Sequence, residues 1–592
     1  MLTKTAFFLL LFSSIFHIAK ANVKVPEGGH EINLAKPSAV LPKEPGIATS
    51  SSLESPNAPG KSVWRFEIQN QPVNAWSVQL GATVQSDIKQ GDRCLLLFHA
   101  RAVNGNKAFG AANVERREPP DFSKLGRTEF KVGPKWEEVV MPFIASGNAV
   151  LGKTGVAIHL GGEVQSIELS GIRLLDYGPD FAFEKLPQPS VSYEGREPDA
   201  AWRKAALERI EKIRKGDFTL EVVDKDGKPQ PNIGVHVSLK RHAFGFGTAV
   251  TAKWLNDESE DGKKYRDIVS SMFSKVVFEN DLKPFAWAAE KDPKSTGGYR
   301  KEWIDKGLAW CAEQHIPVRG HYLMWGPWEP WSKELKDKPE ILRQQIWDHM
   351  VEKLPVVGDR VVEWDCVNHP AGWEANACID TVLGRGVYAN FIKATRQHTK
   401  LPLWVNEDQM FRSGRQQEEY AAIIDGLVKD GAAPDGIGNM AHFHSSFLPS
   451  PEDMLRISDQ FAKLVPHLQI TEYDITANGD EKLAADFTRD ILITAFSHPA
   501  YTGFVMWGFW EGSHWKPETA LWRKDWSPKP AAEVWKHWVT ETWRTDETLK
   551  TDAEGKASVR GFFGRYDVTV NGEVQPVVLG QSGDTLKIVL EK

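Results

Sequence analysis

The sequence predicts an α/β protein in which an all-β sandwich of jelly-roll type precedes a (β/α)8 TIM barrel. The chain has 592 residues, which is too long for a single hydrophobic core. Between residues 62 and 175, short alternating runs are separated by Gly, Asn and Pro turns, a pattern typical of antiparallel sheets. After residue 242, eight apolar runs recur with helix-length spacers. This alternation predicts a closed parallel barrel.

The first part of the chain predicts an exported protein. Lys4 precedes an apolar run over residues 6–18, and Ala19-Lys20-Ala21 resembles a signal-peptidase site. Residues 1–21 are therefore predicted to be a cleavable signal peptide, with the mature protein periplasmic or secreted. Residues 22–60 are rich in Pro, Ser and Gly, which favours a linker or a loosely held first strand.

The β-sandwich is predicted over residues 61–180, with strand-like runs such as SVWRFEI, CLLLFHARAV, EEVVMPF and SIELSGIRLL. Its Trp64, Trp76 and Trp136 are candidates for a sugar-binding platform or for core packing. Residues 181–216 are predicted as a linker and a helix, because Ala, Leu and Ile recur at helical spacing over 200–215.

The barrel is predicted over residues 217–545, with an N-terminal strand extension, and a C-terminal β extension follows over 546–592. Polar residues end most of the eight strand-like runs. Because the active sites of such barrels form at the carboxyl ends of the strands, these residues are expected at one mouth. The runs are 243–250, 275–281, 318–325, 361–369, 403–408, 436–444, 468–474 and 503–509.

Composition excludes several classes of function. A net charge of −7 and a pI near 6.2 leave no basic field for nucleic acid. The four cysteines show no C-x-x-C spacing; Cys366 and Cys378 could pair, but buried thiols are favoured. We expect no cofactor, metal or membrane span, and a monomer. Fifteen of the 23 tryptophans lie between residues 287 and 526, and such flat rings suit both sugar faces and cores.

Five motifs in order carry a resemblance to a known family. They are ENDLK (279–283), RGHYLMW (319–325), WDCVN (364–368), ITEYD (470–474) and the Trp507–Trp515 spacing. The chain resembles glycoside hydrolase family 10, the endo-β-1,4-xylanases. Residues 222–250 and 551–570 are similar to sequences that flank the barrel in multidomain members, which often carry a carbohydrate-binding module ahead of it.

The resemblance implies a secreted, retaining endo-hydrolase acting on a β-1,4-linked polysaccharide such as xylan or a related plant or algal glycan. Glu472 matches the nucleophile, His442 matches the histidine that holds it, and Asn368 matches the contact to the sugar 2-hydroxyl. The implied substrate-binding residues are Glu279, Asn280, Lys283, His321, Trp325, Asn406, Trp507 and Trp515. Trp325, Trp328 and Trp331 also favour a binding wall in the loop after the third strand, with packing as the alternative.

Two positions depart from the family pattern. Met440 stands where a glutamine is usual, and His369 stands where the acid/base glutamate is expected. A retaining glycosidase needs an acid opposite its nucleophile, and a histidine titrates in a suitable range. Three interpretations stay open: His369 is the acid/base; another acid (Glu374, Glu329 or Glu407) has that role; or the barrel binds glycans and cleaves poorly or not at all. An imidazolium could also pair with a uronic acid on the substrate.

Overall fold

The computed structural model describes most of the chain and divides it into two compact units, residues 1–190 and 191–592. We describe each unit by itself. The described residues are 24–72, 74–105, 107–119, 121–187, 192–284, 286–287, 301–326, 335, 337–371, 379–411, 415–445, 447–580 and 582–590. The predicted signal peptide over residues 1–21 lies outside them.

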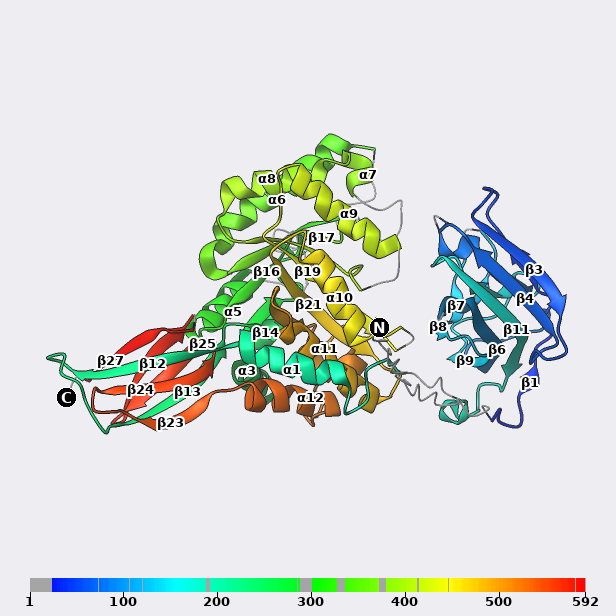
Figure 1. Ribbon diagram of the computed structural model, residues 1–592. Helices are drawn as coiled ribbons and strands as arrows, with labels where there is room; N and C mark the ends of the chain where they lie inside the picture. Colours follow the sequence, from blue (N-terminus) through cyan, green and yellow to red (C-terminus); the bar gives the residue numbers. More distant parts are fainter. Residues whose placement is uncertain are drawn as a thin grey trace, which may run out of the picture. The chain divides into compact units, whose positions relative to one another are not determined.

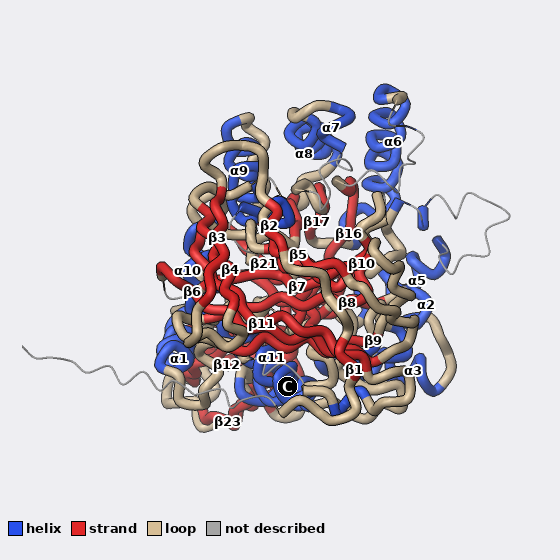
Figure 2. Tube along the Cα trace, turned by 90° about the vertical axis from the view of Figure 1, so that its right-hand side faces the viewer, coloured by secondary structure: helices blue, strands red, loops and turns tan. Residues whose placement is uncertain are grey.

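The first unit is a sandwich of two antiparallel sheets, whose strands β1 to β11 are drawn in red in Figure 2, and its described residues form no α-helix. One sheet has the order β3 (Ala48–Glu54), β4 (Ser62–Ile68), β11 (Gln165–Asp176), β6 (Arg93–Asn104) and β9 (Glu137–Ile144), with β1 (His30–Glu31) beside β11. The other has the order β2 (Ser38–Val40), β5 (Gln79–Thr83), β10 (Thr154–His159), β7 (Ala108–Arg116) and β8 (Lys124–Val132).

The sandwich core follows from the two-residue period of its strands. On β6, Leu96, Phe98 and Ala100 point into the core, where they meet Val156 and Ile158 of β10. Successive side chains of a strand face opposite sides, so one face of each sheet is buried. Of the tryptophans proposed as a platform, Trp64 packs against this core, whereas Trp76 is 57% exposed and Trp136 lies under the guanidinium of Arg101.

The sequence predicts a linker or a loosely held first strand over residues 22–60. Their described part supplies three strands, β1, β2 and β3, and β3 pairs with β4 along all seven of its residues. The segment ATSSSLE is mostly polar and largely exposed, as an edge strand can be. Its low hydrophobicity hides this role in the sequence, because an edge strand with an exposed face needs few apolar residues.

The second unit begins with an irregular segment before the helix α1 (Ala201–Ile213). This helix lies close to the predicted helix over 200–215. Arg203 of α1 is ion-paired with Asp490 at 2.8 Å, and the Tyr193 hydroxyl donates to the same carboxylate at 2.8 Å. Asp490 lies on α11 (Glu481–Ser497), so these contacts hold α1 along α11 (Figure 1).

The barrel has the eight predicted strands, all parallel, and β22 pairs with β14 to close it. The predicted (β/α)8 fold is therefore confirmed. The sixth run is interrupted at Met440 and Ala441, where β19 ends and the short β20 (His442–His444) begins beside β21. The eight strands are β14 (Gly245–Val250), β15 (Lys275–Phe278), β16 (Val318–Trp325), β17 (Glu363–Asn368), β18 (Leu403–Glu407), β19 (Gly436–Asn439), β21 (His467–Thr476) and β22 (Tyr501–Met506).

Helices cover the outside of the barrel, as Figure 1 shows for α1, α5, α10 and α11. Local sequence sets several of their starts: Ser450 caps α10 by accepting the Asp453 N–H, with Pro451 in the first turn. The helices between strands are α2 (Ala252–Leu255), α3 (Glu260–Met272), α5 (Lys301–Glu313), α6 (Pro339–Val357), α7 (Ile379–Leu383), α8 (Val387–His398), α9 (Arg415–Lys429), α10 (Pro451–Phe461), α11 and α12 (Pro530–Trp535). Among the described residues, no helix is long and apolar enough to cross a membrane.

The strands before and after the barrel combine into two small sheets. One has the order β24 (Lys556–Phe562), β12 (Lys215–Asp224), β27 (Thr585–Leu590); the other has the order β23 (Asp546–Lys550), β13 (Gly234–His242), β25 (Gly564–Val570), β26 (Glu573–Leu579). Since β13 leads directly into the first residue of β14, these sheets lie at the amino ends of the barrel strands, away from the mouth. In both sheets, strands of the predicted N-terminal extension thus pair with strands of the predicted C-terminal extension.

A network of charged side chains lies inside the barrel, near the amino ends of its strands. Arg319, fully buried, donates to Glu363 at 2.7 Å and to Asp365 at 2.5 Å, and Lys275 reaches Glu363 at 2.6 Å. Buried charges are tolerated only when paired. The described cysteines Cys94, Cys311 and Cys366 are buried free thiols; Cys378 lies outside the described residues.

Replacing Arg319 by Met is expected to destabilise the barrel by about 3 to 5 kcal/mol, because it leaves two buried carboxylates short of a partner. The control is Lys306→Met, which removes an exposed pair with Glu302 and should cost less than about 1 kcal/mol. Urea unfolding of both variants checks this. Equal stabilities of the two variants would contradict it.

Candidate active site

The carboxyl ends of the barrel strands bring most of the residues expected at the site to one mouth. Its centre is Glu472 on β21, whose side chain is almost entirely buried. His442 Nε2 lies 3.3 Å from Glu472 Oε2, and His442 Nδ1 lies 2.9 Å from Asp474 Oδ2. Glu472 and Asp474 face the same side because they are two residues apart on one strand. The three residues form a carboxylate–imidazole–carboxylate chain.

Electrostatics keep this chain charged. Burial by itself lowers the pKa of His442, but Asp474 and Glu472 outweigh it and raise the pKa to about 10. Burial also raises the pKa of Glu472, but the His442 hydrogen bond and the charges of His321 and Lys283 outweigh it and hold the pKa below its usual value. Glu472 is therefore an ionised carboxylate, the state a nucleophile requires.

An amide bridge links Glu472 to the fourth strand. The Asn406 side chain on β18 donates from Nδ2 to Glu472 Oε1 at 2.7 Å and to Asn368 Oδ1 at 2.8 Å. Thr471 fixes its orientation by donating to Asn406 Oδ1 at 2.6 Å. Asn406, expected to contact substrate, thus also positions two other site residues.

His369 follows β17 directly and shares this mouth. Its backbone N–H donates to the Asn406 carbonyl at 2.8 Å, and its Nδ1 lies 3.1 Å from Glu407 Oε1. Its φ of 54° is left-handed, an uncommon conformation for a residue with a side chain. The backbone of His369 is therefore bonded to the strand that carries Asn406, and its imidazole contacts Glu407.

The residues expected on the non-reducing side of the cleft also gather here. Lys283 donates to Asn280 Oδ1 at 2.9 Å, and its Nζ lies 5.8 Å from the Trp507 ring. Burial lowers the pKa of Lys283 and raises the pKa of Glu279. His321 packs its ring against Trp507, with centroids 5.1 Å apart.

Aromatic side chains border the reacting centre on two sides. Trp515, 49% exposed, packs against His442 and donates from Nε1 to Asp474 at 2.8 Å. Trp325 lies 6.2 Å from the His369 ring, measured between centroids. Among the described residues, neither Trp325 Nε1 nor the Tyr322 hydroxyl has a hydrogen-bond partner. Such buried donors are suited to sugar hydroxyls.

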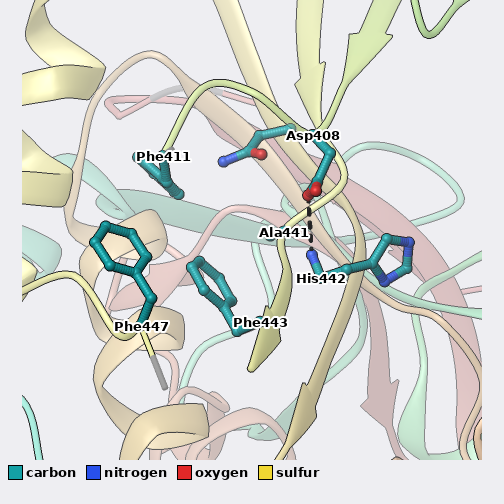
Figure 3. Close-up of a pocket in the computed structure, with 7 residues that line it drawn as sticks. Asp408, Phe411, Ala441, His442, Phe443 and Phe447 are labelled. Carbon is teal, nitrogen blue, oxygen red and sulfur yellow. Dashed lines mark hydrogen bonds between the residues drawn. The ribbon is translucent and has the colours of Figure 1, made fainter. Parts of the chain in front are cut away.

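Met440, the second departure from the family pattern, is fully buried where the sixth strand breaks. Beside it, a small pocket has walls of Phe411, Phe443 and Phe447 (Figure 3). Figure 3 shows the His442 imidazole pointing away from these rings, with its backbone N–H bonded to Asp408 at 3.3 Å.

Sequence reasoning assigned no role to Asp474 and considered Glu407 only as an alternative acid. The spacing of Asp474, two residues after Glu472, was a usable signal. The contact of Glu407 with His369 depends on the register of β17 and β18, which pairs Asn368 with Asn406. The alternative acids Glu329 and Glu374, and the loop residues Trp328 and Trp331, lie outside the described residues.

The site has the elements of a glycosidase barrel, and comparison with known proteins agrees. The profile of glycosyl hydrolase family 10 matches residues 236–537, about half of the chain. The chain belongs to glycosyl hydrolase family 10.

Two curated relatives match over part of their length. Anti-sigma-I factor RsgI6 of Acetivibrio thermocellus is 30% identical over 375 residues, covering 62% of this chain and 46% of that protein. Endo-1,4-beta-xylanase 1 of Arabidopsis thaliana is 24% identical over 457 residues, covering 72% and 46%. The chain thus spans about half the length of these relatives. Xylanase 10B from Thermotoga petrophila RKU-1, solved with xylobiose, aligns at a TM-score of 0.44 and 21% identity, over 51% of this chain and 95% of that one.

The raised pKa of His442 predicts a stability that falls as pH rises. The folded protein keeps the His442 proton up to a pKa of about 10, whereas an unfolded histidine loses it near 6.5. Between these values the folded state binds one more proton, so this residue's stabilisation is complete below pH 6.5 and lost toward pH 10, at up to about 1.4 kcal/mol per unit.

Urea unfolding between pH 7 and 9 tests this prediction by comparing the wild type with His442→Asn. The variant is expected to lack this part of the slope, while other groups contribute equally to both proteins. Parallel pH dependences would show that His442 is not held as an imidazolium.

Proposed function

We propose that this protein is an exported, retaining endo-glycosidase that cleaves a β-1,4-linked polysaccharide, with xylan as its substrate. The observation that carries the proposal is the ionised Glu472, held by His442 and Asn406 in a mouth lined by tryptophans. The membership of glycosyl hydrolase family 10 supports this chemistry. Flat aromatic rings and unpaired donors support a sugar ligand.

In the proposed reaction, the Glu472 carboxylate attacks the anomeric carbon and the glycosidic C–O bond breaks. His369 donates its Nε2 proton to the leaving oxygen. In the second half, His369 takes a proton from water, which attacks the same carbon, and the ester to Glu472 breaks. Each imidazole and carboxylate then returns to its first state.

The rival is a barrel that binds glycans without cleaving them. The electrostatics favour the enzyme, because binding alone gives no reason to keep a buried carboxylate ionised with a dedicated imidazolium beside it. The cost of burying this charge is several kcal/mol before compensation. A nucleophile has to be an ionised carboxylate despite this cost. A binding site could use neutral hydrogen-bonding groups equally well.

Glu472→Gln is expected to lower hydrolysis at least about a thousandfold, the scale of losing a catalytic group. The product anomer, followed by NMR during wild-type hydrolysis, should retain the β configuration. A first-formed α product would contradict the retaining mechanism. A Glu472→Gln variant as active as the wild type would contradict the assignment of the nucleophile.

The role of His369 is tested on a panel of polysaccharides that includes neutral xylan and an acidic β-linked glucan. His369→Ala is expected to lower polymer cleavage by about 10²- to 10⁴-fold, as for loss of a general acid, and His369→Glu to keep measurable activity. Unchanged cleavage by His369→Ala would move the acid elsewhere. Clear preference for neutral xylan would reject pairing between His369 and a uronic acid.

We also propose that the sandwich is a carbohydrate-binding domain. Its exposed Trp76 and its own complete hydrophobic core support an independent binding role. The expected result is that residues 24–187 bind insoluble xylan, and that Trp76→Ala weakens this binding about tenfold, the effect of one stacking ring. A fragment that binds no plant or algal polysaccharide would contradict the proposal.

A further inference from the structure

Glu407 ends β18 directly behind His369, and its side chain is fully buried. Three groups of the described residues contact its carboxylate. The Ala371 N–H donates to Oε2 at 2.8 Å, the Asp408 N–H donates to Oε1 at 2.8 Å, and His369 Nδ1 lies 3.1 Å from Oε1. Both oxygens are therefore held in place by the backbone.

This arrangement selects the orientation of the His369 ring. A carboxylate that accepts two backbone N–H groups is an acceptor, so the ring nitrogen that faces it has to carry the proton. Nδ1–H thus donates to Glu407, and the proton that can be exchanged is the one on Nε2, on the opposite side of the ring. A histidine whose tautomer is fixed this way is suited to proton transfer at a single atom.

The backbone of His369 is fixed as well. Its N–H is bonded to the Asn406 carbonyl, and its own carbonyl packs against Gly326, where an added Cβ would lie 1.9 Å from the His369 oxygen. A left-handed backbone in a residue with a side chain is strained and persists only where its surroundings enforce it. These contacts fix the backbone from which the side chain starts, and the Nδ1 contact with Glu407 orients the ring.

The same contacts explain why Glu407 is not itself the acid. Its carboxylate is fully buried, and His369 covers the Oε1 side. A general acid has to reach within hydrogen-bond distance of the leaving oxygen. Glu407 therefore acts through the imidazole.

We propose that Glu407 is the positioning residue of an imidazole–carboxylate pair that replaces the missing glutamate acid with His369. The proposal rests on the proposed function. In the reaction, only the Nε2 proton moves to the leaving oxygen and is later recovered from water. Glu407 neither gains nor loses a proton; it holds the ring and stabilises the imidazolium when the ring is charged.

The mouth contains a second pair of the same kind, which provides a matched control. Asp474 holds His442 Nδ1 at 2.9 Å as Glu407 holds His369 Nδ1 at 3.1 Å. The partner of His442 Nε2, however, is the nucleophile Glu472. Removing the Glu407 carboxylate should therefore impair proton transfer to the leaving group. Removing the Asp474 carboxylate should instead impair attack by Glu472.

The experiment compares Glu407→Gln with Asp474→Asn on two substrates: xylan, a polysaccharide that needs acid assistance, and 2,4-dinitrophenyl β-xylobioside, which does not. Glu407→Gln is expected to lower kcat on the polysaccharide about 10- to 100-fold, the usual range for an orienting partner, with KM within about threefold. Its pre-steady-state burst on the aryl glycoside should stay within about threefold of wild type. Asp474→Asn should slow that burst.

A double-mutant cycle separates positioning from a structural role. Glu407→Gln added to His369→Ala is expected to cost less than about twofold more, because the group through which Glu407 acts is already absent. The more conservative Glu407→Asp should recover part of the lost rate, and thermal unfolding checks that each variant is folded. Full additivity, or equal losses on both substrates, would overturn the proposal.

The outcomes also separate this inference from the proposed function. If His369→Ala cleaves the polysaccharide like the wild type, the acid assignment fails and Glu407 has no ring to position. If His369→Ala is strongly impaired but a folded Glu407→Gln is not, His369 remains the acid and only the positioning role of Glu407 is rejected.

Discussion

A carboxylate buried in the mouth of a barrel has to be compensated, and this requirement organises the whole site. Glu472 is compensated by His442 on one side and by the amide of Asn406 on the other. His442 is in turn held by Asp474, and Asn406 by Thr471. The Trp515 indole N–H also donates to Asp474, so an aromatic ring at the mouth is tied to the same network.

The buried charges at the amino ends of the barrel strands are compensated in the same way. There Arg319 neutralises Glu363 and Asp365 far from solvent, and Asp365 also holds His321 at 2.9 Å. Because His321 packs against Trp507 at the mouth, the structural network and the site share a member. His321 therefore contacts both Asp365 of the charged network and the Trp507 ring.

Replacing glutamate by histidine at position 369 changes more than the proton donor. A carboxylic acid can donate from either oxygen after a small rotation, whereas an imidazole donates at one atom in one direction. The site therefore needs a device that sets the ring, and Glu407 together with the close approach of Gly326 provides it. The histidine that departs from the family pattern is thus accompanied by contacts that orient it.

The sequence by itself determined the barrel and named the candidate residues for the reaction. The eight strands follow from apolar runs that are local, and Glu472 and His369 follow from motifs of a few residues. Only the tertiary structure decided that residues 24–60 belong to the sandwich and that Glu407 meets His369. Strand pairing and side-chain contacts depend on register between distant segments, and a one-residue shift reverses which side chains meet. No local pattern encodes that register, because it results from packing the complete core.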